Sequence, residues 1–154
     1  MWTVISEKLT DILKNIEGVG LVLSYMPVIS TVSDLLALDI VDGNKQVNFW
    51  IVERQAFRIN RENTNTCTQE WIHTFRISGW KSTTGRNSSY VDFQNLVENI
   101  MEAFSANITL GLPNSTMALS PSVNRIDVSW VGDYMCNFVD ISMPVRELRT
   151  VNYV

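Results

Sequence analysis

Apolar residues near the start of the chain repeat with the period of an α-helix. Their spacing of four, three and four places them on one face of a helix with about 3.6 residues per turn: Ile5, Leu9, Ile12 and Ile16. The opposite face is polar, with Glu7, Lys8, Asp11 and Lys14. Gly18 and Gly20 follow, and glycine accepts the left-handed conformation that often closes a helix. The pattern predicts an amphipathic helix that stops at these glycines.

The next segments are typical of β-strands. The apolar run Val19 to Met26 predicts a first strand, whereas Val28 to Gln46 fits either a short helix or an irregular apolar loop. Apolar residues then alternate along two runs, Val47 to Ile59 and Glu70 to Trp80. These runs predict a hairpin. Its long polar loop, Arg61 to Gln69, is expected to project from the body of the protein.

A second helix is predicted from Tyr90 to Phe104. Ser89 is its candidate N-cap, because a hydroxyl there can accept a hydrogen bond from the first turn, and Asp92 follows three residues later. The residues expected to be buried again follow the helical period: Phe93, Leu96, Val97, Ile100 and Phe104.

The C-terminal third is predicted to be rich in strands. A long connection, Asn107 to Asn124, leads to two strands, Arg125 to Val131 and Tyr134 to Val145, and a tail runs from Arg146 to Val154. Together these elements predict an α+β fold in a single domain, residues 1–154. We expect a mostly antiparallel sheet of four to five strands with two main helices packed on one face.

Charge and composition narrow the classes of partner. The net charge is −4 and no basic run occurs, which argues against sequence-specific binding of nucleic acid. Charged residues make up 18% of the chain, below the roughly 25% of an average soluble domain, while 45% are hydrophobic. This balance favours self-association. The start of the chain does not read as a signal peptide and no apolar run is long enough to cross a bilayer, so we expect no membrane and reduced thiols at Cys67 and Cys136.

Residues that could carry chemistry are scattered along the chain. His73, the sole histidine, lies in an alternating strand, and neither Cys67 nor Cys136 has a second ligand nearby in sequence. Glu98 and Glu102 lie one helical turn apart and are expected to face solvent. The sequence therefore predicts no catalytic residue, no metal site and no cofactor site, and we expect a protein that is not an enzyme.

The five tryptophans could either bind a ligand or pack within the protein. Stacking platforms for sugar or single-stranded nucleic acid would need exposed rings, and for nucleic acid also flanking cations. Packing in the core and at subunit interfaces is favoured, because aromatic residues are enriched in both settings. The residues concerned are Trp2, Trp50, Trp71, Trp80 and Trp130.

The order of these segments resembles the tail terminator, or tail completion, proteins of tailed bacteriophages. The resemblance covers most of the chain and depends on patterns of apolar residues and turns. Its segments, after the first helix, are Ile16-Glu17-Gly18-Val19-Gly20, Phe49-Trp50-Ile51-Val52, Trp71-Ile72-His73, Asp92-Phe93-Gln94-Asn95-Leu96-Val97, and Cys136-Asn137-Phe138-Val139-Asp140-Ile141 with Arg146.

The resemblance implies a structural protein of the virion neck, made in the host cytoplasm. Such a protein forms a hexameric ring on the tail tube protein, stops tube polymerisation, and docks the head-side connector, with the sheath protein as a further partner. A head-completion or other head-tail joining protein is the alternative, and a carbohydrate- or nucleic-acid-binding module is less favoured. The candidate assembly contacts are apolar residues near the chain end: Leu148, Val151, Tyr153 and Val154.

Overall fold

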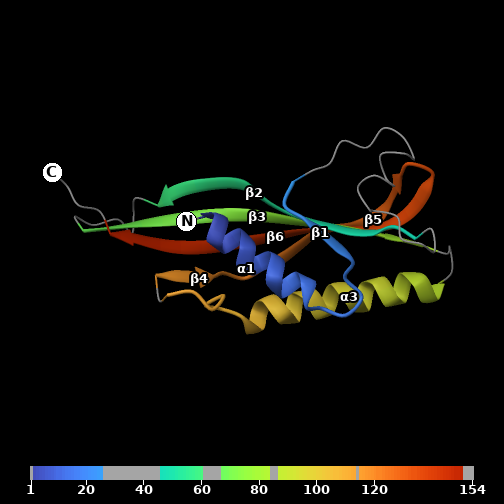
Figure 1. Ribbon diagram of the computed structural model, residues 1–154, viewed down its shortest axis with the longest axis horizontal. Helices are drawn as coiled ribbons and strands as arrows, with labels where there is room; N and C mark the ends of the chain where they lie inside the picture. Colours follow the sequence, from blue (N-terminus) through green and yellow to red (C-terminus); the bar gives the residue numbers. More distant parts are fainter. Residues whose placement is uncertain (1, 26–45, 61–66, 84–86, 114, 151–154) are drawn as a thin grey trace.

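Three long strands carry the sheet, and two helices cover one of its faces (Figure 1). The computed structural model describes residues 2–25, 46–60, 67–83, 87–113 and 115–150. The helices are α1 (Trp2–Lys14) and α3 (Asn87–Ala106). The strands are β1 (Leu21–Leu23), β2 (Asn48–Asn60), β3 (Thr68–Ser82), β4 (Thr116–Ala118), β5 (Ser122–Val131) and β6 (Tyr134–Thr150).

The sheet is mixed but mostly antiparallel. Its strand order is β1-β2-β3-β6-β4, and β5 pairs with a different part of β6. Only the short β1 runs parallel to its neighbour among the strands described. β2 and β3 form the predicted hairpin, with a β-bulge between Arg54 and Ala56. The predicted α+β class, with the helices packed on the sheet, is confirmed.

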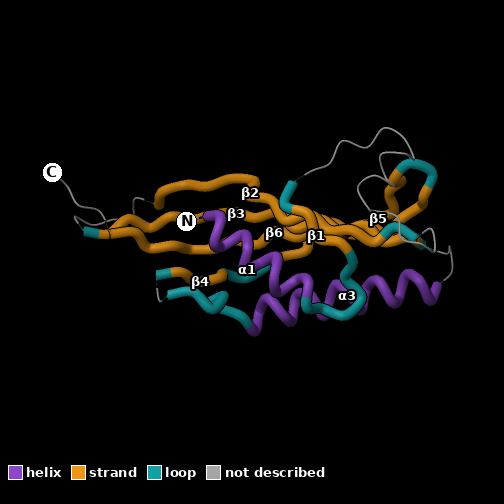
Figure 2. Tube along the Cα trace, viewed as in Figure 1, coloured by secondary structure: helices purple, strands orange, loops and turns teal. Residues whose placement is uncertain are grey.

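The main core lies between the helices and the sheet (Figure 2). Alternate residues of β2, β3 and β6 point toward the helices, because side chains change face at every residue of a strand. The predicted stripe of α3 is confirmed, since Phe93, Leu96, Val97, Ile100 and Phe104 are all buried. In α1, Ile5 and Leu9 are buried as predicted. Leu13 completes that face, whereas Ile12 and Ile16 are only half-buried.

A second apolar cluster lies on the opposite face of β2. Val47, Phe49 and Ile51 alternate with Trp50 and Val52, so the first half of β2 is buried on both faces. Phe49 stacks on Trp80 with ring centroids 4.8 Å apart, and Trp80 lies 5.0 Å from Phe138. Burial on both faces explains why the alternation gives way to successive apolar residues from Phe49 to Val52.

Asn48 ties the turn after α1 to the sheet. Its Nδ2 donates to the carbonyl oxygen of Gly18 at 2.8 Å, and its Oδ1 accepts from the Gly20 amide at 3.1 Å and from the Trp50 indole at 3.0 Å. Gly18 adopts a φ of 94°, which glycine reaches without steric cost. The helix itself ends at Lys14, earlier than the glycines suggested, and these two glycines shape the turn into β1.

Three boundary predictions were wrong. The second helix begins at Asn87, so Ser89 lies inside it, and the Ser89 hydroxyl donates to Thr83 Oγ1 at 3.3 Å rather than acting as the N-cap. The predicted connection from Asn107 to Asn124 contains β4 and the start of β5, because this segment pairs with β6. The predicted tail is strand as far as Thr150, because β6 pairs with β3 to its first residue, Thr68.

Several predictions fall on residues that the structure does not describe. Most of the ambiguous segment Val28 to Gln46 lies outside the described residues. So do the greater part of the loop Arg61 to Gln69 and the last residues of the chain, including Val151, Tyr153 and Val154.

Candidate functional site

A group of ionisable side chains, two of them buried, joins β3 to the end of β6. His73 is fully buried, and its Nε2 lies 2.7 Å from Oε2 of Glu147, which is itself buried. Arg149 donates from Nε to Oε1 of Glu147 at 3.0 Å and from Nη2 to Oε2 at 3.1 Å. The register explains the grouping, because Val145 lies opposite His73 and Glu147 opposite Trp71 on the same face of the sheet.

The protonation states follow from these contacts. Burial lowers the pKa of His73, against the opposing effect of its hydrogen bond to Glu147. A neutral imidazole with its proton on Nε2 therefore donates to the carboxylate. Burial alone would raise the pKa of Glu147, but the hydrogen bonds from Arg149 and His73 outweigh it, so this pKa is lowered and the carboxylate stays charged.

A ladder of arginines and aromatic rings continues from this group across the sheet. The guanidinium of Arg149 lies 4.0 Å from the ring centre of Trp71, which stacks on Phe57 at 5.9 Å. Arg54 lies 4.2 Å from the Phe57 ring and 4.5 Å from the ring of Trp2 at the start of α1. Each cation–π contact is worth about 0.5–1 kcal/mol at an exposed site, so the ladder fastens α1 to the far half of the hairpin.

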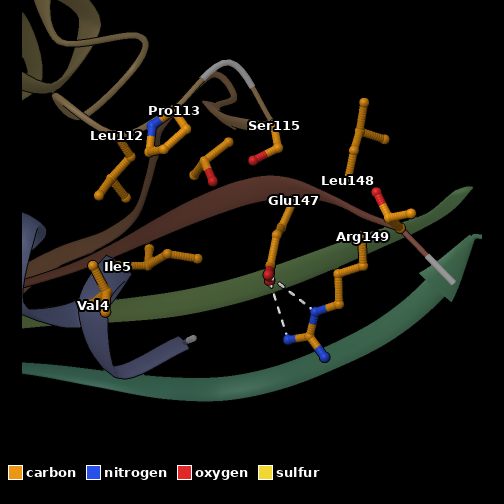
Figure 3. Close-up of a pocket in the computed structure, with 10 residues that line it drawn as sticks. Val4, Ile5, Leu112, Pro113, Ser115, Glu147, Leu148 and Arg149 are labelled. Atoms are coloured by element: carbon orange, nitrogen blue, oxygen red, sulfur yellow. Dashed lines mark hydrogen bonds and ion pairs between the residues drawn. The ribbon is translucent and has the colours of Figure 1, made fainter.

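A pocket of about 510 Å³ opens beside the same group (Figure 3). Val4 and Ile5 of α1 line one side, Leu112, Pro113 and Ser115 line another, and Glu147 and Arg149 line the floor. Both oxygens of Glu147 already accept hydrogen bonds from Arg149 or His73. The carboxylate is therefore committed to holding the strands together.

The remaining residues of chemical interest are dispersed. Cys136 is buried in the second apolar cluster, and burial raises the pKa of its thiol to about 11, which disfavours a thiolate nucleophile. Cys67, Glu98 and Glu102 are exposed, the two glutamates as expected. Within the described part of the chain, no group of three or more His, Cys, Asp or Glu side chains could hold a metal ion.

The tryptophans divide between core and surface. Trp50 is fully buried, and Trp71 and Trp80 are half-buried, which agrees with a packing role. Trp2 and Trp130 are exposed, so these two residues do not pack in the core, and their packing at a subunit interface stays a prediction. Leu148, the one candidate assembly contact that is described, is half-buried and lines the pocket beside Arg149.

The outer side of β5 is a second candidate surface. β6 pairs with β5 on one side, and the described residues place no strand on the other. The exposed side chains of β5 include Val123, Val128 at 51% and Trp130 at 66%. The sequence predicted this strand but not its exposed outer side, because the alternation of apolar and polar residues does not show which strand of a sheet is outermost.

The end of β6 was also missed as a site. The signal was present, since the alternation Met143, Val145, Glu147, Arg149 continues the buried face beyond Val145. The two charged residues concealed it: Glu147 is buried because His73 and Arg149 both contact its carboxylate, and Arg149 itself is half-buried.

Comparisons with known proteins assign no family. No family model matches the chain, and no curated protein matches it. Among solved structures, the core region of PilO from the type IV pilus system of Pseudomonas aeruginosa matches at 13% identity. The match covers 82% of this chain and 97% of that one, with a TM-score of 0.21, a value too low to support a common fold or function.

The resemblance to phage tail terminators was therefore wrong. The solved structure named above is a pilus protein, and no family model or curated protein supports the prediction of a neck protein that caps the tail tube. That resemblance was the basis for predicting a hexameric ring, a virion location, and the tail tube, connector and sheath proteins as partners. The comparisons do not test these predictions, which now have no support. No helix among the described residues is long and apolar enough to cross a membrane.

Proposed function

We propose that this protein is a non-catalytic assembly module that binds a second copy of itself along the outer edge of β5. The observation that carries the proposal is the exposure of Val123, Val128 and Trp130 on an outermost strand. An outer strand presents unpaired amide and carbonyl groups to any strand that approaches. Exposed apolar side chains beside such an edge add area that pairing would bury.

Composition supports self-association. The chain has 18% charged residues, below the roughly 25% of an average soluble domain, so its surface carries fewer of the charges that keep domains apart. The buried group at the end of β6 fits the same role, because His73, Glu147 and Arg149 are engaged with one another and hold long strands in register.

The far half of β2 is the competing edge. β1 pairs only with Phe49, Trp50 and Ile51, and the residues from Gln55 to Ile59 are exposed. A β-bulge between Arg54 and Ala56 interrupts this strand, and bulges on outer strands discourage further pairing. β5 also has a bulge, between Val123 and Arg125, but its pairing with β6 is regular from Arg125 to Val131 and its exposed side chains are more apolar, so β5 is the better template.

The proposal is tested by measuring particle mass against concentration with light scattering. The wild-type protein is expected to form dimers as its concentration rises. Val128→Lys should shift the protein to monomers, because a lysine on an outer strand opposes strand pairing. Val91→Lys is the matched control: Val91 is 50% exposed on α3 against 51% for Val128, and this variant should behave as wild type.

Two results would reject the proposal. One is a wild-type protein that stays monomeric at the highest soluble concentration. The other is a Val128→Lys variant that dimerises as well as the wild type while its circular dichroism shows the native fold.

A further inference from the structure

We infer that two copies of β5 pair antiparallel about a two-fold axis at Ile126, so that Arg125 of each copy meets Asp127 of the other. This inference rests on the proposed self-association and specifies its register. It follows from the direction of the backbone groups of β5, the placement of its charged side chains and the length of the strand.

The outward-facing residues of β5 can be assigned from its hairpin with β6. Val131 pairs with Tyr134 across the two-residue turn, and such a closing pair exchanges its hydrogen bonds. Residues of an antiparallel strand then alternate in the direction of their amide and carbonyl groups, so those of Ile126, Val128 and Trp130 point away from β6. In agreement, the Val128 amide donates to Oδ1 of Asp127 at 2.8 Å, a local bond that pairing with a second copy would replace.

Arg125 and Asp127 lie on the same face of the strand, one on each side of Ile126. Both side chains are exposed, and the guanidinium of Arg125 is held 4.8 Å from the ring centre of Phe138 on that face. When a strand pairs antiparallel with a copy of itself about Ile126, position 125 lies opposite position 127 of the other copy. The two-fold axis therefore creates two identical pairs of opposite charges.

Neighbouring registers are less favourable. A two-fold axis at Asp127 would set the two Asp127 carboxylates opposite each other, and like charges in that position destabilise a sheet. An axis at Val128 would bring Arg125 opposite Val131, which is buried, and would leave Ser122 and Val123 without a partner strand. The axis at Ile126 brings Ser122 through Trp130 opposite one another, nearly the whole of β5, with the bulge between Val123 and Arg125 toward the ends of the paired stretch.

Charge reversal tests this register. Arg125→Asp creates two carboxylates that meet two others across the axis, and Asp127→Arg creates the equivalent clash of arginines. Each variant alone should dimerise at least about tenfold more weakly than the wild type, since the attractive cross-strand pairs become repulsive. An equimolar mixture should recover the wild-type affinity as a heterodimer, because each of the two carboxylates of the first variant then faces a guanidinium of the second.

Native mass spectrometry identifies the heterodimer by its mass, and circular dichroism shows that each variant is folded. Arg58→Asp is the control: it changes the net charge as Arg125→Asp does, but lies on the exposed part of β2 and should leave dimerisation unchanged. Loss of dimerisation in this control would overturn the inference.

The outcomes separate this inference from the proposed function. If the wild type dimerises, Val128→Lys prevents it and neither charge reversal weakens it, the register is wrong while association through β5 stands. If both reversals weaken dimerisation but their mixture does not recover it, the register is also wrong. If the wild type does not dimerise, both statements fail.

Discussion

Gly79 lies directly opposite Trp50 in the pairing of β2 with β3, and the indole ring occupies the space where a Cβ would stand. A Cβ built there would lie 2.2 Å from two ring carbons of Trp50, far inside van der Waals contact. The largest side chain of the core therefore depends on the absence of one beside it. His73 shows a related dependence, because its buried Nε2–H group needs the hydrogen bond that Glu147 accepts from it.

Gly79→Ala is predicted to destabilise the protein by about 1–3 kcal/mol, the usual cost of overpacking a core. The added methyl group forces Trp50 out of its position. Urea denaturation measures the loss, and the same substitution in a Trp50→Leu background is the control, because the smaller side chain leaves room. An equal cost in both backgrounds would show that the tryptophan ring is not the cause.

The pKa of His73 predicts a loss of stability in mild acid. The pKa is lowered in the folded state, so between the unfolded value of about 6.5 and the folded value the unfolded chain binds a proton that the native protein does not. The free energy of unfolding should therefore fall as the pH drops below about 6.5. A further fall is expected below about 4.3, because the pKa of Glu147 is also lowered in the folded state.

His73→Gln keeps an N–H donor for Glu147 but does not titrate. Urea denaturation from pH 7.5 to 5 should show a slope for the wild type that this variant lacks. The comparison uses the slope, because the variant is also expected to differ in absolute stability. Identical slopes would assign the acid sensitivity to other groups.

At the scale of elements, the sequence predicted those whose period is uninterrupted. The β2–β3 hairpin and α3 were found because apolar residues recur at spacings of two and of three to four. β4 was missed because three residues are too few to show a period, and its pairing with Glu147 to Val145 is a tertiary contact. The end of β6 was missed because charged residues interrupt the apolar alternation, although the strand continues.

The candidate site was less predictable than the fold. The sequence predicted no catalytic or metal-binding role for His73, which stays a prediction. Its partners lie near the C-terminal end of the chain, and only the register of β3 with β6 brings them together. The pattern Arg125-Ile126-Asp127 is visible in the sequence, but the sequence does not show that it bears on assembly. That inference needs the strand order, in which β5 is outermost among the described strands on its side of β6.

At the scale of the whole molecule, β6 holds the sheet together. It pairs with the full length of β3 on one side, and with β5 and β4 on the other. Its inward-facing residues Val139, Ile141, Met143 and Val145 belong to the core beneath the helices. The fold therefore has one central strand on which most other elements depend.

This position of β6 sets an order for folding during synthesis. The ribosome makes β6 after every other element described, so until it emerges the β2–β3 hairpin has one edge open and the apolar faces of both helices lack much of their contact. Pairings between segments distant in sequence form slowly, and until β6 has paired the exposed edge of the hairpin favours aggregation or chaperone binding. A chain ending at Val131 is therefore expected to show no amides protected from hydrogen exchange, whereas slow exchange in its hairpin would mean that the core closes without β6.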